Sequence, residues 1–385
     1  MSITNKKIAI IGGGPGGLTL ARLLQINGAT VKVYERDKDR KVRVQGSTLD
    51  LHDDSGLKAL EQGGLMDAFR ENYRPGADLM RVTDKTAQIR YDQHEQGKGQ
   101  DFGEAYFRPE IDRGPLRNIL LDSLDPDTVV WNCHIVSISK VNGLWMLQFE
   151  DGTQVSADLV IGADGANSKI RKFVTDIVPV YSGVTMIEGT VYDAAQNAPR
   201  LWELTQGGKV FALGDNKTLV TSAKGDGSLS FYTGCKVDES WVKECGINFN
   251  DHRQLLEWFK ETYKNWDKIW EELFTNDHTQ FIPRPQYYMP LHQTWETQSD
   301  ITIIGDAAHV MPPYAGEGVN MAMLDALELS ECLTNSEYVE ARDAIAAYEQ
   351  RMRKRAFETT QMTLGQTETL HGPDALETLL DLFKN

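Results

Sequence analysis

The sequence has little of what marks secreted, metal-binding or membrane-spanning proteins. The four cysteines among its 385 residues, Cys133, Cys235, Cys245 and Cys332, are scattered and form no C-x-x-C pair. This pattern excludes a zinc ribbon and a close-spaced redox disulfide, and it predicts reduced thiols in a cytoplasmic protein. The histidines show no metal-ligand spacing such as H-E-x-x-H, so we predict no metal site. No run of about 18 apolar residues occurs, so we expect no membrane span.

The sequence also has fewer basic than acidic residues. The chain has 40 Lys and Arg against 56 Asp and Glu, which gives a formal net charge of −16. A nucleic-acid partner requires a basic surface, so this balance argues against one, and we interpret the acidity as an aid to solubility. Hydrophobic residues at 41% and charged residues at 25% are ordinary for a globular protein. The length allows about two to three domains.

Residues 7–36 contain the most informative pattern in the chain. The apolar run 8–11 is followed at once by glycines, which predicts a buried parallel strand. Apolar residues then recur at helical spacing up to Gly28, a residue suited to ending a helix. A second strand is predicted over 30–34. The order strand, glycine turn, helix and strand is that of a nucleotide-binding unit.

The glycines of this turn match G-x-G-x-x-G at Gly12, Gly14 and Gly17. In a dinucleotide site the first makes the tight turn, the second admits the pyrophosphate, and the third lets the helix pack on the strand. The phosphates then lie at the helix N-terminus, where free N–H groups favour negative charge. Glu35, 21 residues past Gly14, is placed to accept hydrogen bonds from a ribose. The charged segment 36–43 follows, with arginines available for phosphate or nicotinamide contacts.

Two further apolar strands end in glycine and acid. Residues 159–161 run into Asp164 and Gly165, and residues 301–304 run into Gly305 and Asp306. Alternating segments between 177 and about 280 predict an antiparallel sheet. Apolar spacing predicts helices over 56–69, 113–124, 319–333 and 339–370, with Asp112 as a candidate cap of the second.

In this order and at these distances, the three strand ends resemble the group A FAD-dependent monooxygenases, the para-hydroxybenzoate hydroxylase family. The resemblance covers nearly the whole chain. The second motif of that family, D-G-x-x-S-x-x-R, is matched by Asp164, Gly165, Ser168 and Arg171. The third, G-D-A-A-H-x-x-x-P, is matched by residues 305–309 and Pro313.

The resemblance implies an α/β fold with a Rossmann-type FAD-binding domain on a parallel sheet. This domain is expected to take residues 1–72, 105–176 and 283–334. An antiparallel-sheet substrate domain would take 73–104 and 177–282. Residues 335–385 would form a long C-terminal helix that braces the two, followed by a tail.

Within that family the chain is most similar to the tetracycline-inactivating flavin monooxygenases, the tetracycline destructases. The strings YERDKDRKVRVQGSTLDLH, RPEIDRGPLRNILLDSL and GDAAHVMPPYAGEGVN carry this similarity. It implies that Arg43 meets a nicotinamide cofactor, that Asp50, Arg113 and Asp306 meet FAD, and that the helix after Gly318 directs its positive end at the flavin. The full set of expected cofactor residues is Gly12, Gly14, Gly17, Glu35, Arg36, Arg43, Asp50, Arg113, Asp164, Asp306, Pro313, Gly316 and Gly318.

The expected substrate residues depart from that subfamily. Its members present a glutamine, an arginine and a histidine to the antibiotic, where this chain has Glu188, Lys209 and Ser230. Lysine cannot reproduce a bidentate arginine contact, and glutamate adds a charge. Phe211 completes the expected set, and Leu376 stands where the subfamily closes the pocket with an aromatic residue.

The resemblance also implies the chemistry. A single G-x-G-x-x-G leaves NAD(P)H without a domain of its own, so NADPH or NADH is expected to bind transiently, reduce FAD and leave. A flavin C4a-hydroperoxide formed with O₂ would then hydroxylate an electron-rich aromatic or enol in a closed, dry pocket. No protein side chain is assigned a catalytic role. The expected partners are O₂ and a small aromatic or polyketide substrate, and we predict a monomer.

Other interpretations stay open at this point. The chain can be a small-phenol or aromatic-acid hydroxylase of the same family, or an FAD protein that holds an antibiotic-like ligand without turnover. A Baeyer–Villiger monooxygenase would need a second G-x-G-x-x-G, and a flavin halogenase a W-x-W-x-I-P helix; the sequence has neither. A plain NAD-dependent dehydrogenase would leave the second and third motifs unexplained.

Overall fold

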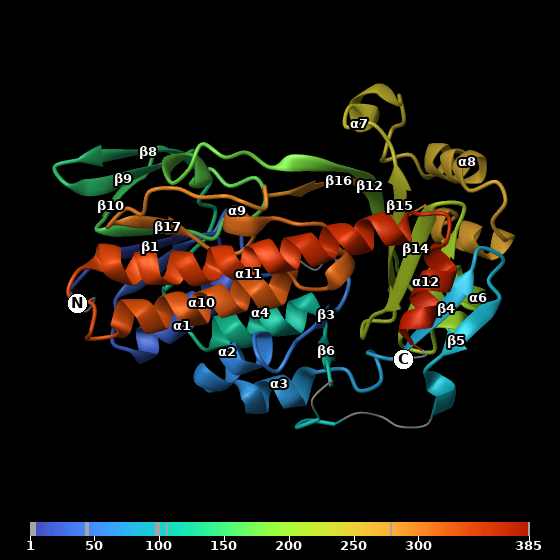
Figure 1. Ribbon diagram of the computed structural model, residues 1–385, viewed down its shortest axis with the longest axis horizontal. Helices are drawn as coiled ribbons and strands as arrows, with labels where there is room; N and C mark the ends of the chain where they lie inside the picture. Colours follow the sequence, from blue (N-terminus) through green and yellow to red (C-terminus); the bar gives the residue numbers. More distant parts are fainter. Residues whose placement is uncertain (1–4, 43–45, 97–100, 105–106, 278, 384–385) are drawn as a thin grey trace.

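The computed structural model describes residues 5–42, 46–96, 101–104, 107–277 and 279–383 of the protein. These residues form a five-stranded parallel sheet and a seven-stranded, mainly antiparallel sheet that lie at opposite ends of the molecule in Figure 1. The long helix α11 (Ala341–Leu370) runs from one sheet toward the other. The predicted α/β fold, with a Rossmann-type parallel sheet, an antiparallel sheet and a long C-terminal helix, is confirmed.

The parallel sheet has the strand order β17-β11-β1-β2-β7. Its strands are β1 (Ile8–Ile11), β2 (Val31–Tyr34), β7 (Val129–Val130), β11 (Leu159–Gly162) and β17 (Ile301–Ile303). Strands β1 and β11 and the edge strand β17 are buried along their whole length, as expected for strands covered on both faces. Ile11 pairs with Gly162 and Gly162 with Ile303, so the ends of β1, β11 and β17 lie at one edge. The three glycine–acid motifs therefore meet there.

Helices α1 (Pro15–Ile26) and α10 (Gly318–Thr334) pack against each other beside this sheet, and α4 (Arg113–Asp122) lies next to α1. All three confirm predicted helices. The single helix predicted over residues 56–69 is wrong, because the chain forms α2 (Gly56–Gln62) and α3 (Met66–Asn72). Gly64, at φ +69°, separates them, since a left-handed residue ends a helix. Asp112 begins α4 without capping it, because its side chain instead accepts from Gly225 N at 2.9 Å.

The seven-stranded sheet has the order β16-β12-β15-β14-β13-β4-β5. Its strands are β4 (Met80–Asp84), β5 (Ile89–Asp92), β12 (Val180–Val191), β13 (Lys209–Gly214), β14 (Lys217–Ala223), β15 (Leu229–Lys236) and β16 (Phe281–Tyr288). Only β13 and β4 pair in parallel among the described strands of this sheet. Strand β16 crosses the limit expected between residues 282 and 283, and the domain limits themselves stay a prediction.

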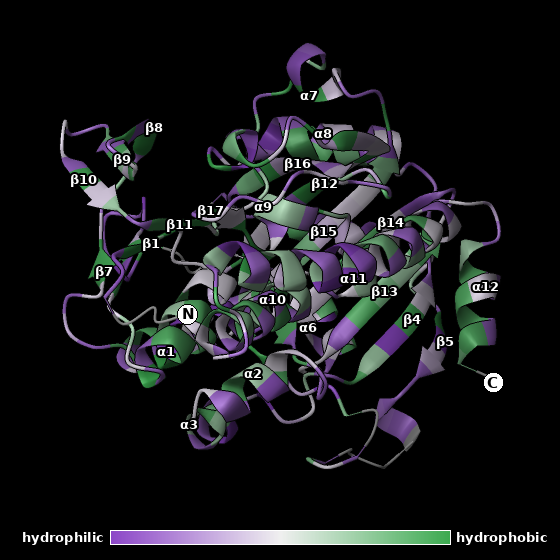
Figure 2. Ribbon diagram, turned by 60° about the vertical axis from the view of Figure 1, so that its left-hand side comes forward, coloured by the Kyte–Doolittle hydropathy of each residue, from purple (hydrophilic) through white to green (hydrophobic). Residues whose placement is uncertain are grey.

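One face of this sheet forms a core of its own. Because side chains alternate along a strand, Val210, Leu219 and Phe231 point to the same side, where they are fully buried. Helix α8 (His252–Thr262) and the 3-10 segment η3 (Lys268–Phe274) cover them, with α6 (Pro199–Thr205) beside the sheet. Figure 2 shows hydrophobic and hydrophilic residues alternating along β4 and β13. The opposite face is therefore free to line a site.

Short elements complete the described fold. Strands β8 (Ile135–Val141), β9 (Leu144–Phe149) and β10 (Gln154–Ala157) form a small antiparallel sheet, and β3 (Leu49–Asp50) pairs with β6 (Glu110–Ile111). Loop elements include α7 (Trp241–Glu244), α9 (Asp306–His309) and η4 (Pro313–Ala315). Helix α12 (Ala375–Leu382), in the predicted tail, packs against β13. A search of the helices in the described ranges found none with the length and apolar content of a membrane span.

Candidate cofactor and substrate site

The turn after β1 is shaped by its three motif glycines. A Cβ on Gly12, which has φ +110°, would lie 2.3 Å from Ala163 O, and one on Gly17 would lie 2.1 Å from Gly12 O. These two positions admit only glycine, because β11 and the turn itself occupy the space. At Gly14 a Cβ would meet no atom within 4 Å, so the N-terminus of α1 faces open space there. This arrangement fits the pyrophosphate of a dinucleotide.

Glu35 directly follows β2 and is only 2% exposed. Its carboxylate accepts from Gly13 N at 2.5 Å and from Asp37 N at 2.9 Å, so it holds the glycine turn in place. The expected ribose contact of Glu35 stays a prediction. Arg36 follows it as an exposed residue, and Arg43 lies outside the described residues.

Arg171 joins the second motif to the third. Its side chain is 7% exposed and donates to the carbonyls of Ala307 at 2.7 Å and Asp306 at 2.8 Å. Asp164 closes its own turn, because it accepts from the Ser168 hydroxyl at 2.5 Å and from Lys169 N at 2.6 Å. Both side chains thus act on protein groups, and the cofactor contact expected of Asp164 stays a prediction.

Asp306 follows β17, and its side chain is exposed. The residue is accessible to solvent, yet protein atoms surround it closely enough that burial raises the pKa of Asp306. The charges of His309 and Arg113 act in the opposite direction. An accessible, hydrogen-bond-accepting carboxylate near a cation fits the polyhydroxyl chain of a dinucleotide cofactor.

The loop before α10 also leads to an open helix N-terminus. Gly316, at φ +72°, lies close to Asp50, since a Cβ there would be 3.4 Å from either carboxylate oxygen. A Cβ on Gly318 would meet nothing within 4 Å at the N-terminus of α10. Pro313 begins η4 and is exposed. A second helix N-terminus is therefore available to an electron-rich group.

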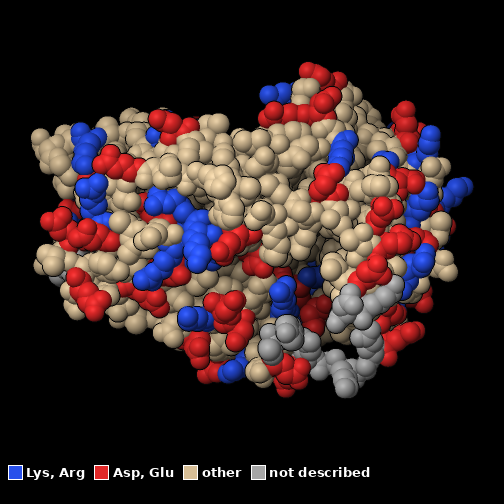
Figure 3. Space-filling model, in the orientation of Figure 1, with Lys and Arg blue, Asp and Glu red and all other residues tan. Residues whose placement is uncertain are grey.

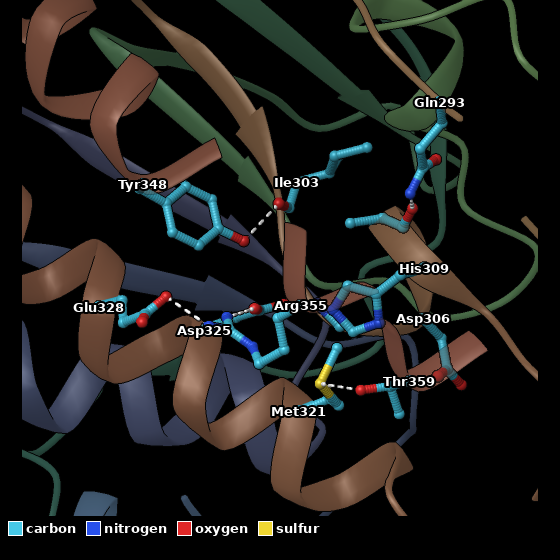
Figure 4. A network of polar contacts seen from close by, with 12 residues as sticks. Gln293, Ile303, Asp306, His309, Met321, Asp325, Glu328, Tyr348, Arg355 and Thr359 are labelled. Carbon is cyan, nitrogen blue, oxygen red and sulfur yellow. Dashed lines mark hydrogen bonds and ion pairs between the residues drawn. The ribbon is translucent and has the colours of Figure 1, made fainter. Parts of the chain in front are cut away.

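A buried polar network supports the turn that carries Asp306 (Figure 4). The Asp325 carboxylate accepts from Gly305 N at 2.8 Å, contacts His309 Nε2 at 2.6 Å, and pairs with Arg355 at 2.7 Å. Asp325 is fully buried, and burial alone would raise its pKa. His309 and Arg355 nevertheless lower the pKa of Asp325. His309 lies beside Asp306 in Figure 4, so this network fixes the loop that presents Asp306.

The loop also contacts the C-terminal helices. Ala315 N donates to Thr363 Oγ1 of α11 at 3.1 Å, and the Tyr314 hydroxyl lies 3.2 Å from His371 Nε2. Leu376, from α12, and Tyr314 both pack against the small buried cluster that contains Leu213. These contacts connect the end of α11 to both the loop and the seven-stranded sheet.

The strand register places the four expected substrate residues on one face of the sheet, in two neighbouring rows. Ser230 pairs with Ser222 and Ser222 with Lys209, which places Ser230 and Lys209 in one row across the sheet. In the next row Glu188 pairs with Tyr232, and Phe211 follows through Val220. All of these side chains lie on the face opposite the sheet's own core. The predicted cluster therefore exists as a surface, while the role of each residue stays a prediction.

Two residues at this surface, Tyr232 and Glu110, were not predicted from the sequence. Tyr232 accepts from Ser47 N at 2.9 Å through its hydroxyl, and Glu110 contacts the Lys209 ammonium. Their positions gave a usable signal, because Tyr232 is two residues from Ser230 on one strand and Glu110 precedes Arg113 in a motif string. The contacts of Tyr232 and Glu110 became evident only from the strand pairing, across β14 for Tyr232 and between β3 and β6 for Glu110.

A second group of acids lies next to Lys209. Asp50 and Glu110 are cross-strand partners on β3 and β6, and Asp50 contacts His52 at 3.0 Å. Burial alone would raise the pKa of Asp50, but the hydrogen bond from His52 and the charge of Lys209 lower this pKa. Burial raises the pKa of Glu110 in spite of the ammonium beside it. Figure 3 shows a hollow where the helical layer meets the seven-stranded sheet, with acidic and basic side chains at its edge.

Comparison with known proteins agrees with this geometry. Residues 5–110 and 140–363 match the FAD binding domain family, and the chain belongs to it. The protein is an FAD-dependent monooxygenase, as predicted. Monooxygenase asqM of Emericella nidulans is 29% identical, with 93% of this chain and 94% of that protein covered. Monooxygenase penA of Penicillium thymicola is 28% identical over 93% of each.

Solved structures show the same fold. A putative FAD-containing monooxygenase from Photorhabdus luminescens superposes with a TM-score of 0.77 at 24% identity, over 95% of this chain and 98% of that one. The tetracycline destructase Tet(55) superposes with a TM-score of 0.78 at 18% identity, over 100% of this chain and 95% of that one. At these identities the likeness concerns the fold alone.

Proposed function

We propose that the protein is an NAD(P)H-consuming hydroxylase that transfers one oxygen atom from O₂ to an electron-rich aromatic or enol substrate. The observation that carries this proposal is the register of the seven-stranded sheet. It gathers Glu188, Lys209, Phe211 and Ser230 on one face, and Lys209 reaches Glu110 beside the Asp50 strand. A substrate on this face lies next to the residues expected to hold FAD.

The cofactor would be held mainly by backbone groups and a few side chains. The open N-termini of α1 and α10, at Gly14 and Gly318, would meet its phosphate and ring ends. Asp306, Asp50 and Arg113 would meet its polar groups, with Pro313 and Gly316 in the adjoining loop. When bound, FAD supplies the redox chemistry, which is the acceptance of a hydride from NADPH or NADH and the activation of O₂.

The protein side chains position the substrate and exclude water. Phe211 and Tyr232 offer aromatic faces for stacking against a ring, which favours a flat substrate. Ser230 Oγ is buried and has no hydrogen-bond partner within the described residues, so it is available to a polar group of the substrate. We assign no general base among these residues.

Two substrate classes deserve direct comparison. The sequence resemblance points to tetracyclines, whereas the relatives 25% to 27% identical include 6-hydroxynicotinate 3-monooxygenase of Pseudomonas fluorescens and 6-methylsalicylate 1-monooxygenase of Aspergillus terreus. The pairing of Glu188 with Arg284 at 2.7 Å leaves neither group free to replace the glutamine of the tetracycline enzymes. We therefore place smaller phenols and other small aromatic substrates ahead of tetracyclines.

The test measures NADPH and NADH oxidation by the FAD-loaded protein with a tetracycline and with a panel of phenols, followed by mass spectrometry. Substrate-stimulated oxidation with a product one oxygen atom heavier supports the proposal. Stimulated oxidation with only hydrogen peroxide formed means that the ligand sits wrongly for transfer. A yellow protein that binds the ligands and never oxidises NAD(P)H would identify a binding protein and overturn the proposal.

A further inference from the structure

Lys209 projects from the substrate face, and its ammonium already has an anionic partner. Its ammonium contacts a carboxylate oxygen of Glu110, a residue that is 1% exposed. Glu110 is fixed on β6 by pairing with β3, and Lys209 is fixed on β13. The two charges belong to different sheets, so the pair forms only where the layers meet.

The surroundings of this pair are acidic. Asp50 lies opposite Glu110 on β3, and Glu317 lies 3.6 Å from His52, which itself contacts Asp50. With the three carboxylates ionised, the Lys209 ammonium and the Arg108 guanidinium, which acts on Glu317, leave the cluster negative while His52 is neutral. Asp78 contributes a further negative charge that acts on Lys209.

Two cations near the sheet face have partners of their own, and Arg108, which is exposed, acts on Glu317. Arg284 pairs with Glu188 at 2.7 Å. Arg113 donates to Ser47 O at 3.2 Å and acts on Asp306, toward the expected cofactor. A substrate carboxylate placed on the sheet face would lose its water without gaining an uncommitted cation, and such desolvation is costly.

We propose that Glu110 sets the charge preference of the substrate site, so that the site takes an aromatic or enol substrate with an uncharged amide, ketone or hydroxyl edge and rejects the matching carboxylate. This inference rests on the proposed function and names its substrate class. Glu110 acts through Lys209, by cancelling the charge that would otherwise attract an acid.

Two buried polar groups suit an uncharged polar edge. Ser230 Oγ has no hydrogen-bond partner among the residues described, and the Glu110 carboxylate interacts there with Lys209 and with the Thr48 side chain. The hydroxyl can donate or accept, and the carboxylate oxygen accepts an N–H or O–H. An amide or hydroxyl satisfies both groups, whereas a carboxylate offers no proton to Glu110.

The test compares 4-hydroxybenzoate with 4-hydroxybenzamide, which have nearly the same shape and differ in charge. Calorimetric titration gives the dissociation constant of each for the FAD-loaded protein without requiring turnover. We expect the wild type to bind the amide more tightly. We expect Glu110→Gln to shift the affinity ratio about tenfold toward the carboxylate, because Lys209 then becomes an uncompensated cation.

Two further variants separate this effect from misfolding. Asp92→Asn breaks the buried Arg81–Asp92 pair at 2.8 Å, in which Arg81 projects from the core side of the same sheet, and it should leave the ratio unchanged. Lys209→Met should not raise the affinity for 4-hydroxybenzoate relative to that for 4-hydroxybenzamide. The inference is overturned if folded Glu110→Gln keeps the wild-type ratio, or if Lys209→Met selectively weakens 4-hydroxybenzoate. The second result would show that Lys209 already binds acids.

Because the readout is binding, the inference and the proposed function fail separately. A protein that shows the charge preference and yields no oxygenated product retains the site and loses the reaction. A protein that hydroxylates substrates and prefers the carboxylate retains the reaction and loses the inference.

Discussion

The edge of the parallel sheet and the free face of the seven-stranded sheet are built in different ways. At the edge, backbone N–H groups, glycines and buried anchors such as Glu35, Arg171 and Asp325 define the shape. On the face, side chains from neighbouring strands define it, and the register alone decides which ones meet. The first construction suits a cofactor that does not vary, and the second allows the substrate to change by single substitutions. Substitutions at the edge and on the face test this contrast.

The largest effect is expected where a buried charge anchors the edge. Asp325→Ala leaves Arg355 and His309 without their shared carboxylate and should cost about 3 to 5 kcal/mol in the free energy of unfolding. Chemical denaturation measures it, and flavin content per protein should fall in parallel. Glu328→Ala removes the other partner of Arg355, at 2.8 Å and partly exposed, and should cost less. An equal loss of stability in both variants would mean that the buried Asp325 contributes no more than the partly exposed Glu328.

The same residue gives the protein a pH dependence. The folded-state pKa of Asp325 lies below its ordinary value of 3.8, so the unfolded chain takes up the proton first. The stabilisation is therefore fully present above the unfolded pKa and is lost as the pH falls through the folded-state pKa. Acid unfolding of the wild type should show this loss, and the curve of Asp325→Ala should be flatter over that range. Parallel curves would contradict the assignment.

Two glycines of one motif should separate folding from cofactor binding. A Cβ at Gly17 would overlap Gly12 O, so Gly17→Ala should destabilise the protein by about 3 kcal/mol. A Cβ at Gly14 meets open space, so Gly14→Ala should fold normally and bind FAD about tenfold more weakly. Thermal unfolding and FAD titration of the apoprotein measure the two quantities. The idea of an open phosphate site at Gly14 fails if Gly14→Ala binds FAD as the wild type does.

Asp306→Ala tests the side chain on which the cofactor assignment depends most. We expect the purified variant to lose its yellow colour or to bind FAD about tenfold more weakly, because one or two hydrogen bonds to a charged acceptor are removed. Its stability without FAD should change little, since the wild-type carboxylate is solvent-accessible. Retention of FAD at wild-type affinity would place the cofactor elsewhere.

The smallest effect is expected on the substrate face. Ser230→Ala removes a buried hydroxyl that lacks a partner among the described residues, so stability should be unchanged or slightly raised, while substrate affinity falls about fivefold. Thr233 on the same strand also carries a buried hydroxyl, but it points to the core side of the sheet. Thr233→Val should leave substrate affinity unchanged. Equal effects on binding would show that the two faces do not differ in function.

The contrast also explains what could be predicted from the sequence. The glycine turn, the Asp164 and Asp306 motifs and helix α11 were predictable, because each rests on local spacing or on backbone conformations that few residues adopt. The break at Gly64 was missed, because apolar spacing on either side continued the helical pattern. The pairings of Glu110 with Lys209 and of Glu188 with Arg284 were missed, because they join strands that are 99 and 96 residues apart. Sequence separation, rather than weak chemistry, hid them.

Oxygen transfer from O₂ to the substrate is best tested by supplying the FAD-loaded protein with NADPH, a substrate that stimulates NADPH oxidation, and ¹⁸O₂ in ordinary water. We predict a product that carries one ¹⁸O atom, and none when ¹⁸O is supplied as water under ordinary O₂. Product oxygen that comes from water, or NADPH consumption with no oxygen gained by any substrate, would contradict this prediction.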